Sequence, residues 1–347
     1  MKVSVLGAGA IGSMLGGLVK HRDPSLDIVF IGRGEHGRKM AERGGVVLHG
    51  PWGTCEARVR CTENLAEIAD SDLVLLTVKS QATDEALRAA APHLGEAVLV
   101  SIQNGINRHV LARHVPPERL VLGMTATNMA VLTPGEVSLQ LDGATILGGP
   151  PGQERGQAVV LAVEVLRKSG LRIERHDNVT GVQYNKLAIN ALGYASVLSA
   201  SNFITECVLH RPWRREVGNR VLDECIAAFA GANLRLEPIP GVPDVHRFRR
   251  VMKLLDLPMV GGIAGFVARR KFNRKPIVFS LYQDLKRKKT TEIDFINGEI
   301  VRLAGEHGGH APANALVVEM VREMEVRGDG RFFSREEVIG RFSALPG

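Results

Sequence analysis

Long hydrophobic runs, paired cysteines and aromatic residues are all scarce in this chain of 347 residues. The longest apolar stretches, such as 257–268, fall short of the roughly 20 residues that a membrane-spanning helix needs, so we expect no membrane partner. Aromatic residues make up 5% of the chain and do not interleave with its basic residues, which argues against a nucleic-acid-binding surface. Ala, Val, Leu and Gly dominate instead, with 45% hydrophobic and 23% charged residues, as is ordinary for a globular protein.

The four cysteines form no recognisable pair or metal-binding set. Cys55, Cys61, Cys207 and Cys225 include no CxxC pair and show no metal-like spacing with histidine. A metal site is therefore not expected, and free thiols in a reducing compartment are the simplest interpretation. Together with the lack of a membrane span, this predicts a cytoplasmic protein.

The N-terminus resembles a secretion signal only superficially. Lys2 is followed by an uncharged run over residues 3–19, but five glycines interrupt it. A strand, a glycine-rich turn and a helix account for every one of those glycines. We therefore interpret the run as the start of a folded domain rather than as a signal peptide.

The net charge of +7 is concentrated in one segment. Residues 240–290 contain 13 Lys or Arg against three Asp, a local charge of +10, so the rest of the chain sums to −3. A basic segment can attract nucleic acid, an acidic metabolite or a phosphorylated cofactor. No nucleic-acid motif accompanies it, so a small anion or a simple solvated face is favoured, and we expect no nucleic-acid partner.

Two different patterns divide the chain, whose length already predicts two domains. Strands and helices alternate up to about residue 177, and the Val-, Leu- and Ile-rich strands suit a sheet covered on both faces. From Thr180 onward the apolar spacing is helical. We predict an α/β fold: a Rossmann-type doubly wound parallel sheet over 1–177, followed by an all-helical domain over 178–335. The pattern changes near His176–Val179.

The individual elements follow from the same patterns. Buried strands are predicted at 2–6, 26–32, 72–79, 97–105 and 171–175, and 121–149 has the pattern of a meander at the sheet edge. Helices are predicted at 11–19, 84–94, 157–170, 221–232, 277–289, 292–308 and 313–325. Pro and Gly clusters at 238–243 and 258–265 indicate linkers between helices.

The sequence GAGAIG, residues 7–12, has the spacing G-x-G-x-x-G between a predicted strand and a predicted helix. In that context Gly7 permits a tight turn, Gly9 lets the backbone approach a pyrophosphate, and Gly12 lets the helix pack on the strand. The alternative is a packing turn without a ligand. We predict a dinucleotide site whose cofactor-binding residues are Gly7, Ala8, Gly9, Ala10, Ile11 and Gly12.

The second strand indicates which dinucleotide binds. An NAD site usually has Asp or Glu at the end of this strand, to bind the ribose 2′-hydroxyl. Here the first side chain after the strand is Arg33, with Arg38 nearby, and a guanidinium suits a 2′-phosphate. Glu35 is the competing feature, and Arg33 could be an ordinary surface arginine. We predict NADP(H) as the cofactor.

Polar residues follow two further strands. Lys79 ends TVK and Asn104 ends SIQN, where open sheets bind ligands beyond the carboxyl ends of their strands. Each could be a plain loop residue. Together, at adjacent strand ends beside the glycine turn, they are predicted to line the cofactor and substrate cleft.

The helical stretch QYNKLAINALGYASVLS, residues 183–199, carries Lys186, Asn190 and Tyr194 four residues apart, hence on one face. Buried polar groups are costly, so this face should line a site. A lysine whose pKa is brought toward neutrality can give a proton to an alkoxide that forms when a ketone accepts hydride. The alternative is a salt-bridged or snorkelling lysine. We expect the amine to face the nicotinamide.

A second group lies downstream, where Ser280 lies on one predicted helix and Glu292 at the start of the next. Thr290 or Thr291 could cap the second helix. Glu292 could orient Lys186 or bind substrate, or it could merely complement the helix dipole.

The motifs GAGAIG, TVKSQ, IQNG, YNKLAIN and S…QD…TEIDFINGE resemble, in order and spacing, those of the ketopantoate reductase (2-dehydropantoate 2-reductase) family. The resemblance implies NADPH-dependent reduction of 2-dehydropantoate to (R)-pantoate, on the way to pantothenate, between a Rossmann and a helical domain. It implies these roles: Lys186 as proton donor, Glu292 as the carboxylate beside substrate and cofactor, Asn104 at both ligands, Ala130 at the cofactor, and Asn190 and Ser280 at the substrate.

Two departures from the family pattern leave alternatives open. Tyr194 stands where the family usually has a second substrate-contacting asparagine, and it offers one hydroxyl in place of an amide. A bulkier or more apolar 2-oxo acid is therefore an alternative substrate. The basic stretch near 239–276 is longer than in compact members. The local charge of +10 over residues 240–290 leaves open a dinucleotide-binding sensor or a nucleic-acid-associated module. A homodimer is also left open.

Overall fold

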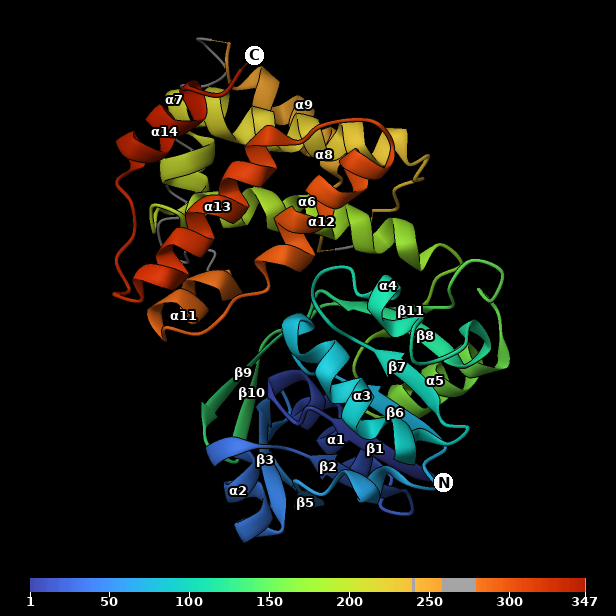
Figure 1. The fold of residues 1–347 in the computed structure, drawn as a ribbon. Helices are drawn as coiled ribbons and strands as arrows, with labels where there is room; N and C mark the ends of the chain where they lie inside the picture. Colours follow the sequence, from blue (N-terminus) through green and yellow to red (C-terminus); the bar gives the residue numbers. More distant parts are fainter. Residues whose placement is uncertain (239–240, 258–278, 347) are drawn as a thin grey trace. The chain divides into compact units, whose positions relative to one another are not determined.

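The computed structural model describes residues 1–238, 241–257 and 279–346 (Figure 1). The chain forms two compact units. The first is Met1–Gln183 together with Ile239–Gly241, and the second is Tyr184–Pro238 together with Val242–Gly347. The chain first passes from one unit to the other within a single helix, α6 (Val179–Val197).

The first unit is built on an eight-stranded sheet of order β12-β11-β8-β7-β6-β1-β2-β5. The strands are β1 (Lys2–Leu6), β2 (Asp27–Ile31), β5 (Arg60–Thr62), β6 (Leu73–Leu76), β7 (Val98–Ser101), β8 (Leu120–Thr125), β11 (Thr145–Gly148) and β12 (Ile173–Arg175). Every neighbouring pair is parallel except β8 and β11. The order reverses between β1 and β6, as in a doubly wound sheet. The predicted fold class is confirmed.

Apolar strand sequences account for the position of this sheet. LVLL of β6 is fully buried, and in DIVFI of β2 only Asp27 is exposed. The covering helices are α1 (Ala10–Arg22), α2 (Gly34–Arg43), α3 (Thr83–Leu94), α4 (Arg108–Leu111) and α5 (Gln157–Arg167). Helices α1 and α5 contact each other and contribute side chains to one core cluster with β1, β2 and β6. Because both faces of the sheet are covered, a ligand can reach it only at the ends of its strands.

A second sheet was not foreseen from the sequence. It has the order β4-β3-β10-β9 and is formed by β3 (Gly45–Gly50), β4 (Gly53–Arg58), β9 (Asn128–Thr133) and β10 (Glu136–Leu141). The predicted edge meander over 121–149 is therefore wrong in part. Strand β8 lies inside the main sheet, between β7 and β11, and β9 and β10 leave it. The reason is non-local: β10 pairs in parallel with β3, far away in sequence.

Among its described residues, the regular elements of the second unit are all helices, as predicted. Its helices are α6, α7 (Arg211–Trp213), α8 (Asn219–Gly231), α9 (Val245–Leu254), α11 (Ser280–Lys286), α12 (Ile293–Glu306), α13 (Pro312–Arg327) and α14 (Arg335–Ser343), with π-helical turns at Phe203–Val208 and Arg214–Gly218. The predicted helices at 221–232, 292–308 and 313–325 correspond to α8, α12 and α13.

The remaining predictions for the second unit agree with the structure only in part. Of the helix predicted at 277–289, residues 279–289 are described, and α11 covers Ser280–Lys286 of them. The linker predicted at 258–265 lies outside the described residues. Helices α9 and α14 were not predicted. Within the described ranges, every helix is too short or too polar to cross a lipid bilayer.

Candidate active site

The glycine turn joins β1 to α1, and its three glycines differ in how closely other atoms surround them. Gly7 has φ +98°, and a Cβ there would lie 2.5 Å from the Val78 backbone nitrogen. A Cβ on Gly12 would lie 2.4 Å from Thr77 Oγ1, whose hydroxyl donates to the Gly7 carbonyl at 2.7 Å. Gly7 and Gly12 are thus required by the fold itself.

Gly9 is different, because no neighbouring side chain or strand crowds it. Its φ of −88° suits any residue, and the nearest atom to an added Cβ is the Gly7 carbonyl oxygen at 4.0 Å. It precedes α1, whose first N–H groups receive no side-chain cap from it. The exposed backbone here fits a pyrophosphate, since a bare glycine and free helix N–H groups are what such a ligand needs.

The ends of three further strands lie at the same edge of the sheet as the glycine turn. The Gly7 and Ala8 N–H groups both donate to the Ile31 carbonyl at the end of β2, at 3.0 and 3.2 Å. Arg33 follows β2, is exposed and immediately precedes α2. Glu35 is in the first turn of α2, where a carboxylate complements the helix dipole. The sequence prediction that Arg33 stands at this strand end is confirmed in position.

Lys79 follows β6, which pairs with β1, and Asn104 follows β7, the next strand after β6. Lys79 is exposed, whereas Asn104 is half-buried. The Asn104 carbonyl accepts hydrogen bonds from Ser80 Oγ at 2.5 Å and Asn107 Nδ2 at 3.1 Å, which fix the loop. Four predicted cofactor positions therefore share one edge of the first unit.

Ala130 lies in β9, in the second sheet, opposite Ser138 of β10. The turn between these strands is attached to α2: the Gly135 N–H donates to His36 Nδ1 at 2.9 Å. The other ring nitrogen of His36 lies 3.2 Å from Ser13 Oγ in α1. Burial lowers the pKa of His36, so the neutral ring accepts at Nδ1. Sequence reasoning missed His36, whose contacts are all tertiary.

In the second unit, α6 carries Lys186, Asn190 and Tyr194 on one face, as predicted. Lys186 is half-buried, and burial lowers its pKa to about 8, whereas the nearby Glu292 charge acts in the opposite direction. Glu292 is 5% exposed and immediately precedes α12. A proton donor must carry its proton at neutral pH and yet release it readily, and a lysine with a lowered pKa meets both requirements.

The surroundings of Glu292 bear on its alternative role. Its side chain makes no capping hydrogen bond to α12, and Thr291 Oγ1 instead accepts from the Ile293 N–H at 3.3 Å. The Thr291 N–H is in turn held by Glu325 at 2.7 Å. The start of α12 is therefore capped by Thr291 and not by Glu292.

Tyr194 is buried, and its hydroxyl lies 3.0 Å from Ser280 Oγ at the start of α11. Burial raises the pKa of Tyr194, with Glu292 acting in the same direction, so the phenol stays protonated. Asn190 is half-buried, and its amide makes no hydrogen bond to another residue in the described ranges. The structure therefore brings Tyr194 and Ser280 together.

Two phenylalanine rings pack around Tyr194 and Ser280, and the sequence alone did not predict these contacts. The Phe279 ring meets Tyr194 edge-on at 6.4 Å and Phe203 at 5.3 Å. It packs so closely on α6 that a Cβ at Gly193 would lie 2.1 Å from it. No local spacing signals this contact, since it joins residues of different helices.

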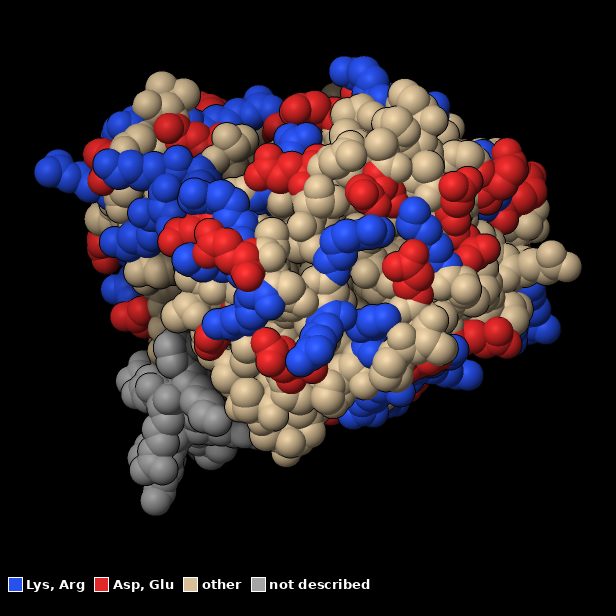
Figure 2. Space-filling model, turned by 90° about the horizontal axis from the view of Figure 1, so that it is seen from below, with Lys and Arg blue, Asp and Glu red and all other residues tan. Residues whose placement is uncertain are grey.

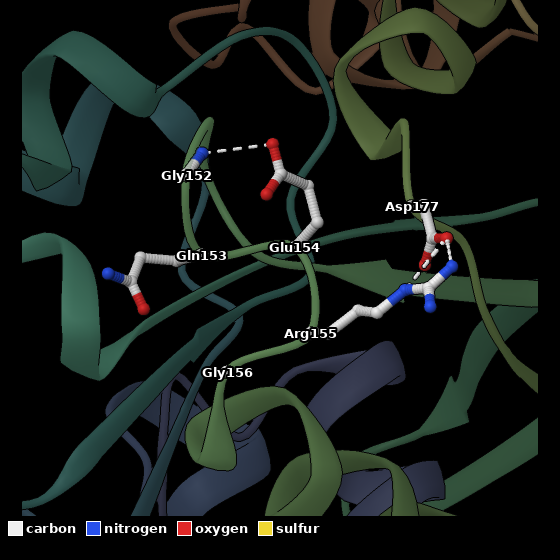
Figure 3. A pocket seen from close by; sticks show the side chains of 6 residues that line it. All are labelled: Gly152, Gln153, Glu154, Arg155, Gly156 and Asp177. Atoms are coloured by element: carbon white, nitrogen blue, oxygen red, sulfur yellow. Dashed lines mark hydrogen bonds and ion pairs between the residues drawn. The ribbon is translucent and has the colours of Figure 1, made fainter.

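A hollow of about 560 Å³ lies elsewhere in the first unit (Figure 3). It is lined by residues 152–156 and by Asp177, which pairs with Arg155. The loop follows β11, which runs antiparallel to β8. It therefore lies at the amino ends of the parallel strands, whereas the glycine turn lies at their carboxyl ends. None of the predicted site residues lines this hollow.

The basic segment is only partly within the described residues, because five of its 13 Lys and Arg fall in 258–278. Among the others, Arg249 is nearly buried and forms a two-pronged ion pair with Asp223, with both contacts at 2.6 Å. On the face of the molecule in Figure 2, Lys and Arg lie interspersed with Asp and Glu. At least one basic residue of the segment is therefore structural.

A doubly wound sheet with a glycine turn at its crossover, followed by a helical unit with a desolvated lysine, defines a two-domain, dinucleotide-dependent oxidoreductase. Two family models match the chain: ketopantoate reductase PanE/ApbA over residues 3–152 and ketopantoate reductase PanE/ApbA C terminal over residues 178–325. The chain belongs to the ketopantoate reductase family. It is an oxidoreductase of the type that acts on a CH–OH group.

Individual relatives agree with this assignment. The chain is 29% identical over 335 residues to a 2-dehydropantoate 2-reductase of Pyrococcus horikoshii, covering 95% of this chain and 99% of that one. It is similar in fold to a ketopantoate reductase of Ralstonia eutropha, with a TM-score of 0.76 at 24% identity, covering 94% and 99% of the two chains. It is also similar to D-mandelate dehydrogenase with NADH and anilino(oxo)acetate, with a TM-score of 0.71 at 22% identity, covering 95% and 100%.

Proposed function

We propose that this protein reduces 2-dehydropantoate to (R)-pantoate with NADPH, with Lys186 as the proton donor. The observation that carries the proposal is the half-buried Lys186, whose pKa is lowered to about 8 beside a buried Glu292. Membership of the ketopantoate reductase family supports the reaction class. The four free cysteines favour a cytoplasmic location, where thiols stay reduced.

The first unit is proposed to bind the dinucleotide and the second to supply the acid. The proposed cofactor residues are Gly7, Ala8, Gly9, Ala10, Ile11, Gly12, Arg33, Lys79, Asn104, Ala130 and Glu292. The proposed substrate residues are Asn104, Lys186, Asn190, Tyr194 and Ser280. When bound, the nicotinamide supplies hydride to the keto carbon.

The chain's own residues supply the proton. At neutral pH the Lys186 ammonium carries its proton, and it neutralises the negative charge that develops on the keto oxygen. Transfer of that proton leaves a neutral amine, which burial favours. The amine then takes up a proton from water before the next turnover, and the Glu292 carboxylate favours that protonated form.

The choice of NADPH rests on Arg33. Its guanidinium stands at the end of β2, where a carboxylate would bind the ribose hydroxyls of NADH, and it can pair with a 2′-phosphate instead. The relative solved with NADH shows that the fold also serves the other dinucleotide. The preference of this chain for NADPH is therefore attributed to Arg33, the residue at the end of β2.

A second candidate substrate is a bulkier, more apolar 2-oxo acid. It is favoured by Tyr194, whose hydroxyl is already engaged with Ser280 and whose ring is part of a cluster with Phe279 and Phe203. Such a cluster offers more apolar surface and fewer free polar groups than an asparagine would. The chemistry at Lys186 is the same for both candidates.

A substrate panel distinguishes the two. We expect NADPH-dependent turnover of 2-dehydropantoate with the highest kcat/KM in a series that also includes 2-oxo acids with branched aliphatic and phenyl side chains. A higher kcat/KM for one of those acids would favour the second candidate. Lack of turnover with every acid, by a folded protein that binds NADPH, would reject both.

A further inference from the structure

A buried hydrogen bond joins the helix of Lys186 to the helix of Glu292. The Tyr184 hydroxyl in α6 donates to Glu299 Oε1 in α12 at 2.6 Å, and both residues are 2% exposed. Tyr184 precedes Lys186 by two residues, and Glu299 lies two helical turns beyond Glu292. The bond therefore links the two elements that carry the proposed acid and its carboxylate.

Both partners of this bond are themselves held in place. Arg302 donates to both oxygens of Glu299, from Nε to Oε2 and from Nη2 to Oε1, each at 2.7 Å. The Tyr184 ring meets Phe229 of α8 edge-on at 5.4 Å. Neither side chain can turn away without loss of a buried contact, so the link between the helices is stiff.

A second tie prevents α12 from sliding along α6. Asn297 Nδ2 donates to the Ala191 carbonyl at 3.3 Å and to Asn314 Oδ1 at 3.0 Å, and Asn297 is fully buried. Two ties at different points along both helices fix their relative register. The buried ionic group here is Glu299. Such a group adds little stability over apolar packing of the same volume, and its best-attested use is to specify the register of the elements that it joins.

We propose that Tyr184 and Glu299 are positioning residues that hold the helix of Glu292 in register with the helix of Lys186. The inference rests on the proposed role of Lys186. If the link is cut, α12 relaxes, the influence of Glu292 on Lys186 weakens, and the desolvated amine loses its proton at lower pH. Binding of the dinucleotide by the first unit does not depend on the link.

The test is the pH profile of kcat for Tyr184→Phe, which removes one hydroxyl and keeps the ring on Phe229. We expect the alkaline limb to move to lower pH by about half a unit, the change that lengthening a close charge pair by about 1 Å would cause. Glu299→Gln should move it in the same direction. The affinity for NADPH should be unchanged in both variants.

Tyr282→Phe is the matched control, because Tyr282 lies in α11, stacks on Phe332 and contacts neither Lys186 nor Glu299 in any described interaction. Its pH profile should match that of the wild type. The proposal is overturned if both Tyr184→Phe and Glu299→Gln keep the wild-type alkaline limb. It is also overturned if neither variant folds, because the bond would then serve the whole unit rather than the lysine.

The result separates this inference from the function it rests on. If Lys186→Ala retains full turnover, the proposed proton donor is wrong and the pH limb has another source. If Lys186→Ala abolishes turnover while the limb of Tyr184→Phe stays in place, only the positioning role fails.

Discussion

The Glu292 carboxylate acts on the Lys186 ammonium in the direction opposite to burial. Desolvation is the larger effect and lowers the pKa of the lysine, while Glu292 raises it, and the balance is a pKa of about 8. Without the carboxylate, the pKa of this lysine would lie lower, and less of the amine would carry a proton at physiological pH. Without the burial, it would hold its proton too firmly.

Lys186→Ala should therefore lose turnover while it keeps its cofactor. We expect kcat to fall by about 10²- to 10⁴-fold, the usual contribution of a positioned general acid. NADPH affinity, measured by calorimetry, should change little because the glycine turn is in the other unit. Turnover close to wild type would contradict the assignment.

The pH dependence of ketone reduction should show the same lysine. Only the protonated amine can donate, so kcat should be level below pH 8 and fall above it, by about tenfold per pH unit. In Glu292→Gln the influence that raises the pKa is removed, so the fall should begin at lower pH. A profile that stays flat to pH 9.5 would mean that another group gives the proton.

Arg33→Ala should weaken NADPH binding selectively. Loss of a charge-assisted contact to the 2′-phosphate should raise Kd for NADPH by about 10- to 100-fold and leave NADH nearly unchanged. Arg88→Ala, which removes an equal charge from an exposed position on α3, is the control. Equal weakening of both dinucleotides by Arg33→Ala would show that this residue does not bind the phosphate.

The glycine turn predicts two opposite phenotypes. In Gly12→Ala the new methyl lies 2.4 Å from Thr77 Oγ1 and 2.7 Å from Val5 Cγ1, and overpacking should cost about 1–3 kcal/mol of unfolding free energy. In Gly9→Ala nothing within the protein is crowded, so Tm should hold while NADPH affinity falls roughly tenfold or more. Normal NADPH binding by Gly9→Ala would argue for a packing turn without a ligand.

Tyr194 should govern substrate preference. Tyr194→Asn replaces the ring with an amide, and we expect the ratio of kcat/KM values to move toward 2-dehydropantoate and away from apolar acids. The cavity should cost about 2–4 kcal/mol of stability. Tyr194→Phe, which only releases Ser280, serves as the matched variant. An unchanged ratio in Tyr194→Asn would remove Tyr194 from the specificity determinants.

Local patterns predicted the parts of the fold that depend on neighbours in sequence. The strands DIVFI and LVLL are buried on both faces, so unbroken apolar runs marked them. Strand β4, GTCEAR, is mostly exposed and carries no such run, and its sheet depends on pairing between distant strands. Helix α9 is rich in arginine and was interpreted only as a basic segment.

The candidate site divides in the same way. Lys186, Asn190 and Tyr194 could be predicted to share one helix face because helical spacing is visible within a short stretch of sequence. Glu299, Phe279 and His36 were not, because each matters through a contact with a different element. Periodicity shows which face of a helix is unusual, but not which side chain of another helix meets it.

The start of α6 has a practical consequence for anyone who wishes to express the dinucleotide-binding half alone. Val179 and Val182 are each 1% exposed, and Gln183 Nε2 donates to the Gly123 carbonyl at 3.0 Å. A fragment that stops where the sequence pattern changes, near residue 177, would lack these residues and would expose the parts of β8 and β11 that they contact. One that runs through the first turn and a half of α6 should keep these contacts and behave as a separate folding module.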